Sequence, residues 1–132
     1  MEPRLIWANF VSGDLEKTKA FYTALGFKRN GDYEDAESAC FVFGESQFII
    51  NFFTEERLSK PVNGGLSSPT TANEIIFSLS ANSEEEVDQW AEKVKQAGGS
   101  IFSEPQKYQQ GYTFGFADPD GHKFNFLYWP GM

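Results

Sequence analysis

The chain repeats one order of secondary structure, in which a strand is followed by a helix and then by further strands. Equivalent positions in the two copies lie at a nearly constant spacing, since Trp7 and Glu74 are 67 positions apart and Asn51 and Asn125 are 74 apart. A copy of this size would form only a marginal core alone. The repeat therefore predicts two α+β modules that share one core or exchange strands with a partner chain.

Two segments have helical periodicity and recognisable ends. Apolar residues recur at steps of three and four after Asp14, an N-cap residue type, until Gly26 ends the pattern. Ser83 and Glu86 have the spacing of a capping box, and Gly98 ends the second apolar stripe. Each module therefore contains one amphipathic helix.

Segments rich in aromatic and β-branched residues predict the strands, and turn residues separate them. Residues 57–73 are rich in Gly, Pro, Ser and Thr and predict a linker, either disordered or able to close as a lid. One domain would thus span 1–132, with module 1 at about 1–56 and module 2 at about 74–132. The expected strands are 5–11, 38–43, 47–53, 74–80, 101–105, 112–117 and 123–129.

Charge and composition exclude several classes of partner. The formal net charge of −8 disfavours nucleic acid and anionic lipid, and no apolar run approaches the length of a bilayer span. Cys40 is the only cysteine, which favours a reducing cytoplasm and a thiol that acts as a small buried hydrophobe. Aromatic residues make up 17% of the chain, enough to form a large core or to line a cavity. The expected partner is a small molecule, without nucleic acid or membrane.

Two motifs carry a resemblance to a known family. The segments DLEKTKAFYTALGF at 14–27 and DPDGHKFNF at 118–126, in the repeated order described above, resemble the vicinal oxygen chelate superfamily. That superfamily holds glyoxalases, bleomycin-resistance proteins and extradiol dioxygenases, and the chain is most similar to bacterial proteins labelled predicted lactoylglutathione lyases. The resemblance implies two βαβββ modules that pair into a curved mixed sheet around a cleft, and it implies a homodimer.

The same resemblance locates the place where metal-dependent relatives bind a divalent ion. Those ligand positions correspond here to Trp7, Asn51, Glu74 and Asn125. An indole N–H only donates a hydrogen bond, and a neutral amide oxygen is a weak metal ligand, so Glu74 alone has ligand strength. We therefore expect no cofactor and no catalytic metal at these positions.

The single histidine is a second candidate ligand, and strand alternation tests it. In the segment 122–128, His122 has the parity of Phe124, whereas Lys123 and Asn125 share the other face, which the family turns toward its cleft. His122 is thus interpreted as a residue flanking the turn.

Alternation applied to the other strands gives a predicted cleft face of rings and polar groups, the composition of a small-molecule pocket. In a purely structural alternative, Asn51 and Asn125 bond each other or water between the modules. Tyr112 and Phe114 are candidate stacking surfaces for a ligand. The other predicted binding residues are Trp7, Asn9, Asn51, Phe53, Ser78, Lys123 and Asn125, with Glu74 as the candidate catalytic residue.

Two functions follow from this face. The first is a binding protein, without catalytic metal, for a small aromatic or amphiphilic molecule, and the acidic chain would suit a cationic one. The second is a lyase or isomerase that acts on a carbonyl compound with Glu74 as acid or base, which requires Glu74 to lie in a weakly hydrated cleft. Exposure of Glu74 at the start of its strand is the alternative.

Overall fold

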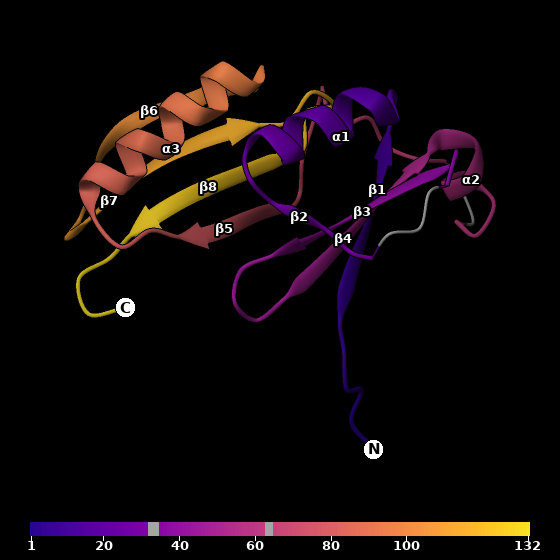
Figure 1. The fold of residues 1–132 in the computed structure, drawn as a ribbon, viewed down its shortest axis with the longest axis horizontal. Coiled ribbons are helices and arrows are strands. Elements are labelled where there is room, and N and C mark those ends of the chain that lie inside the picture. The colour runs from indigo at the N-terminus through magenta and orange to yellow at the C-terminus, as the bar shows by residue number, and fades with distance from the viewer. Residues whose placement is uncertain (32–34, 63–64) are drawn as a thin grey trace. The chain divides into compact units, whose positions relative to one another are not determined.

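The protein is described by a computed structural model covering residues 1–31, 35–62 and 65–132, which form the compact units Met1–Ser67 and Ser68–Met132. The first unit contains β1 (Trp7–Ser12), α1 (Leu15–Ala24), β2 (Lys28–Arg29), β3 (Ser38–Phe43), β4 (Phe48–Thr54) and α2 (Glu55–Ser59). The second contains β5 (Ile76–Ser80), α3 (Glu84–Ala97), β6 (Ser100–Tyr108), β7 (Gly111–Ala117) and β8 (Lys123–Tyr128) (Figure 1). The expected α+β class and the repeated βαβββ order are confirmed.

Each unit has a four-stranded mixed sheet of the same topology. The strand orders are β1-β4-β3-β2 and β5-β8-β7-β6. In both sheets the first strand pairs in parallel with the last, because the helix carries the chain across before the later strands return. The remaining pairings are antiparallel.

The two main helices begin where the capping residues predict. The Asp14 carboxylate accepts hydrogen bonds from the backbone N–H groups of Glu16 and Lys17, which opens α1. The Ser83 hydroxyl accepts from the N–H of Glu86, whose carboxylate in turn binds the N–H of Asn82. Both helices therefore begin with otherwise unpaired backbone donors satisfied by side chains.

Aromatic rings fill the face of each sheet that the helix covers. In the first unit Tyr22 of α1 is fully buried and packs against Phe52 at 4.9 Å between ring centroids. In the second unit Phe126 stacks on Trp90 of α3 at 4.4 Å, and Phe116 stacks on Phe124 at 5.3 Å. Much of the high aromatic content thus forms the two cores.

Three features differ from the sequence prediction. The predicted linker contains the end of α2, whose N-cap is Thr54, and its residues from Ser68 onward belong to the second unit. The two-residue strand β2 was missed because it is too short for an alternating pattern. Strand β6 continues past Pro105, since its pairing with β7 is interrupted by bulges that tolerate a residue without an N–H.

Within the described residues, no helix is both long and apolar enough to cross a membrane.

Candidate functional site

Each sheet has a second face, opposite the one that the main helix of its unit covers, and side-chain alternation predicts the binding residues there. In the first sheet Trp7 and Asn9 are exposed on β1, with Asn51 and Phe53 following the same alternation on β4. Trp7 is 52% exposed. Phe52, which lies between Asn51 and Phe53 on β4, alternates to the opposite face and is fully buried. The alternation on this sheet is as predicted.

Two asparagines of the first open face bind each other. Asn9 and Asn51 are cross-strand partners, and Asn51 Nδ2 donates to Asn9 Oδ1 at 3.0 Å. Phe53 is covered by Arg57, whose guanidinium carbon lies 4.7 Å from the ring centroid and which also pairs with Asp35 at 2.6 Å. The hydrogen bonds from the backbone of Glu37, from Ser38 and from Arg57 hold the pKa of Asp35 below its ordinary value. Arg57, which alternation along strands cannot detect, therefore competes with any ligand that would stack on Phe53.

The same face carries the single cysteine. Cys40 pairs in register with Asn51 and is half-buried on the open face, rather than buried as the sequence predicts. Burial raises the pKa of the Cys40 thiol, against the smaller lowering effects of a hydrogen bond with Asn30 and the charge of Arg29. The thiol is thus a poor nucleophile despite its position.

This arrangement predicts slow thiol chemistry. At pH 8 the folded protein should react with a disulfide reagent such as dithionitrobenzoate severalfold more slowly than the same chain unfolded in guanidinium, because less thiolate is present and access is reduced. The absorbance of the released thiolate measures both rates. Equal rates would show that neither burial nor the raised pKa protects Cys40.

A chain of polar side chains crosses the open face of the second sheet. Ser78 donates to Asn125 Oδ1 at 2.6 Å, and Asn125 Nδ2 donates to the Thr113 hydroxyl at 3.2 Å. Thr113 then donates to the carbonyl of Phe126 at 2.7 Å. Each donor along β5, β8 and β7 is satisfied by the next strand, which fixes the orientation of the Asn125 amide.

A pocket of about 430 Å³ lies beside this polar chain, where the segment 70–74 meets the open face. Its floor and walls include Ile76, Phe102 and Lys123. Phe102 is 49% exposed, and its ring lies across Gly115, where a Cβ atom would come within 2.6 Å of it. Lys123 donates to the carbonyl of Gly121 at 2.8 Å, with Nζ 5.9 Å from the centroid of Phe102. The pocket thus combines an aromatic wall with an ammonium group.

Phe102 is the aromatic residue of the pocket that the sequence prediction missed. It lies on β6, whose irregular pairing with β7 defeats simple alternation. The signal available was Gly115, because a glycine inside a strand marks a close approach by another group. Its place between two phenylalanines could have suggested a ring lying against that strand.

Two residues predicted to stack on a ligand lie elsewhere. Phe114 is fully buried and stacks on Phe126, on the face that α3 covers. Tyr112 donates from its hydroxyl to Asp88 of α3 at 3.0 Å, and this hydrogen bond raises the pKa of Tyr112. Their assignment to the open face was wrong, because the residues of β7 that reach it are Thr113 and Gly115.

Glu74 lines the pocket but is exposed, in a bend that precedes β5. Of the two environments that the sequence leaves open for Glu74, a weakly hydrated cleft or exposure near the start of its strand, the structure shows exposure. His122 also has the position predicted from its parity, just before β8, and is 4% exposed. Its backbone N–H donates to Asp118 Oδ1 at 2.9 Å.

The residues at the family's metal positions do not fit a divalent ion. The oxygen of Asn125 already accepts the Ser78 hydroxyl, and the amide of Asn51 is engaged with Asn9. Trp7 has no lone pair to offer, so Glu74 is left as the one strong ligand type of the four.

The comparisons with known proteins agree with this architecture. Residues 4–126 match the glyoxalase/bleomycin resistance protein/dioxygenase superfamily. A hypothetical protein from S. aureus is 36% identical with a TM-score of 0.85, and the match covers 97% of this chain and 95% of that one. No curated protein matches the chain.

Two more distant structures share the fold. A glyoxalase-related enzyme from Fulvimarina pelagi is 21% identical, with a TM-score of 0.83 and coverage of 97% and 90%. The fosfomycin resistance protein FosX from Mesorhizobium loti is 16% identical, with a TM-score of 0.70 and coverage of 97% and 93%. The extent of the sequence match and the βαβββ topology lead to one assignment: the chain belongs to the glyoxalase/bleomycin resistance protein/dioxygenase superfamily, within the vicinal oxygen chelates.

Proposed function

We propose that the protein binds a small amphiphilic or aromatic molecule on the open face of its second unit, without a catalytic metal at the family positions. The observation that carries this proposal is the pocket formed by Phe102, Ile76 and Lys123. Its volume of about 430 Å³ falls in the range typical of small-molecule sites. An apolar wall with a few oriented polar groups is also their usual composition.

The charged groups of the pocket narrow the class of ligand. Lys123 presents an ammonium group beside the Phe102 ring, and Thr70 and Thr71 contribute to the same lining. These groups favour a ring or short apolar body that carries a carboxylate or another anionic group. Glu74 at the rim would accept an amine, so an aromatic zwitterion uses both charges. This differs from the purely cationic ligand suggested by net charge.

The test compares two exposed aromatic residues of the same strand. A fragment set of aromatic acids, amines and amino acids would be screened by ligand-observed NMR, and dissociation constants of the hits measured on Phe102→Ala and Tyr108→Ala. Phe102→Ala should weaken binding about tenfold or more, because stacking is lost. Tyr108→Ala should bind as wild type, since Tyr108 is exposed on β6 outside the pocket lining.

A second pair of variants tests the charge. Lys123→Gln should weaken the acidic hits selectively, and Lys17→Gln, at an exposed position on α1, should leave them unchanged. Equal affinity for Phe102→Ala, Lys123→Gln and wild type would rule out this pocket as the binding site.

One observation supports the enzymatic alternative, a lyase or isomerase. Glu74 and Lys123 line the same pocket, so a carboxylate base and an ammonium group able to stabilise an enolate are present together. In that case Glu74→Gln would retain ligand affinity while losing exchange of the α-proton of a bound carbonyl compound, measured in D₂O by NMR. If the wild-type protein bound such a compound without exchanging its α-proton, the enzymatic alternative would be ruled out and only the binding function would remain.

A further inference from the structure

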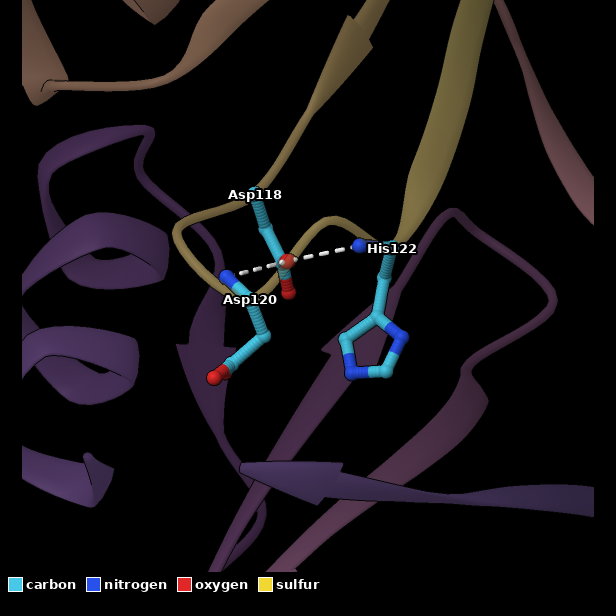
Figure 2. A group of neighbouring side chains, drawn as sticks. All are labelled: Asp118, Asp120 and His122. Carbon is cyan, nitrogen blue, oxygen red and sulfur yellow. Dashed lines mark hydrogen bonds between the residues drawn. The ribbon is translucent and has the colours of Figure 1, made fainter. Parts of the chain in front are cut away.

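A second group of polar side chains lies in the turn between β7 and β8. Asp118, Asp120 and His122 alternate along this turn, and Figure 2 shows their side chains projecting toward a common region. One ligand atom from each, a carboxylate oxygen or an imidazole nitrogen, lies within 4.8 Å of the others. Neither the binding pocket nor the family's metal positions include these residues.

Backbone hydrogen bonds hold the turn rigid. Asp118 Oδ1 accepts from the N–H groups of Asp120, Gly121 and His122 at 3.0, 3.0 and 2.9 Å. The Asp118 N–H donates to the carbonyl of His122 at 3.0 Å, which closes the base of the turn. The backbone of the turn and the direction of the Asp118 side chain are thus set before anything binds, which reduces the entropy cost of bringing ligands together.

Burial separates this group from ordinary surface acids. Asp118 is 3% exposed and His122 is 4% exposed, while Asp120 is half-buried. An imidazole and a carboxylate shielded from water interact more strongly with a cation than exposed groups do. Asp120 is the one residue of the three that is in partial contact with solvent.

We propose that Asp118, Asp120 and His122 bind a divalent first-row transition metal, of which Zn²⁺ is the reference, as a structural clamp on this turn. Zinc binds nitrogen and carboxylate oxygen at about 2.0–2.2 Å in a tetrahedral arrangement, which places two ligand atoms about 3.5 Å apart. The three ligand atoms lie within 4.8 Å of one another, so rotation of the Asp120 and His122 side chains would bring them to that spacing. Imidazole favours Zn²⁺, Co²⁺ or Ni²⁺ over Mg²⁺ or Ca²⁺, which prefer oxygen alone.

The clamp would act on the segment that forms the pocket wall. A Cβ atom on Gly121 would come 2.8 Å from the carbonyl oxygen of Pro69, so the turn packs directly against the start of segment 69–74. Lys123 also anchors to Gly121. Metal binding would therefore stabilise the turn, and with it two sides of the pocket, without contacting the ligand.

Titration of the metal-free full chain with Co²⁺, followed by absorption, and with Zn²⁺, followed by calorimetry, tests the proposal. We expect one ion per chain and weakening of about 100-fold in Asp120→Asn, since an amide is a poor replacement for a carboxylate ligand. His122→Gln should lose the Co²⁺ spectrum, and if that variant fails to fold, Asp120→Asn decides alone. Glu85→Gln, which removes one exposed charge on α3, should bind as wild type.

Two results would overturn the site. The first is the absence of saturable binding to the wild-type chain, or equal binding by wild type and Asp120→Asn. The second is binding that survives Asp120→Asn but is lost in Glu74→Gln, which would place the ion at the family's own metal position. Neither result depends on whether fragments bind beside Phe102, so the proposed function is judged separately.

Discussion

Tyr22→Ala should destabilise the protein by about 3–5 kcal/mol, because it removes a fully buried aromatic side chain and leaves a large cavity. Its ring is the centre of the first core and packs between α1 and the sheet. The centroids of the surrounding rings lie at 5.0 Å for Phe21, 5.5 Å for Phe41, 5.6 Å for Phe43, 4.9 Å for Phe52 and 6.4 Å for Phe27. Urea denaturation followed by circular dichroism measures the change in the free energy of unfolding.

Tyr108→Ala is the matched control, because the same side chain is removed from an exposed position. It should change the free energy of unfolding by less than about 0.5 kcal/mol. Similar losses for the two variants would mean that Tyr22 does not occupy a packed core. The melting temperature of Tyr22→Ala should fall by roughly 10–20 °C.

Gly121→Ala should cost about 2–4 kcal/mol, for two reasons that add. Gly121 has φ +102, a backbone conformation that a residue with a Cβ adopts only with strain. The new Cβ would also lie 2.8 Å from the Pro69 carbonyl oxygen and 3.1 Å from the Thr70 Cα, both backbone atoms that cannot rotate away. Thermal denaturation gives the loss, and the fragments that bind beside Phe102 should bind more weakly as the pocket wall shifts.

Gly131→Ala separates the two contributions. It has φ +85 but nothing within 4 Å of the new Cβ, so only the backbone strain applies, about 1 kcal/mol. If Gly121→Ala proved no more costly than Gly131→Ala, the packing of the turn against segment 69–74 would be absent in solution. The difference between the two variants thus measures the contact that connects the turn to the pocket.

Local sequence signals predicted most of the fold, for reasons visible in the structure. The helix starts at Asp14 and Ser83 follow from backbone donors that a neighbouring side chain must satisfy, which is a local requirement. Side-chain parity placed Trp7 and Asn51 on an open face, because alternation along a regular strand needs no knowledge of its neighbours. It also separated His122 from Asn125 correctly.

The same reasoning failed where distant residues decide. Tyr112 and Phe114 lie on the covered face, where Tyr112 reaches Asp88 of α3 and Phe114 stacks on Phe126, and these partners come from other elements of the fold. Phe102 reaches the pocket through irregular pairing of β6, and Arg57 covers Phe53 from another element. Whether an aromatic residue forms core or pocket thus depends on contacts between strands.

The sequence alone was enough to determine the charge and the family of the chain. It also showed that Trp7, Asn51 and Asn125 are weak metal ligands, because ligand strength is a property of the side-chain type. The sequence could not predict the pocket around Phe102 or the convergence of Asp118, Asp120 and His122, because each depends on distances between atoms. Those distances are set by strand register and by the packing of one segment against another, which are long-range properties of the folded chain.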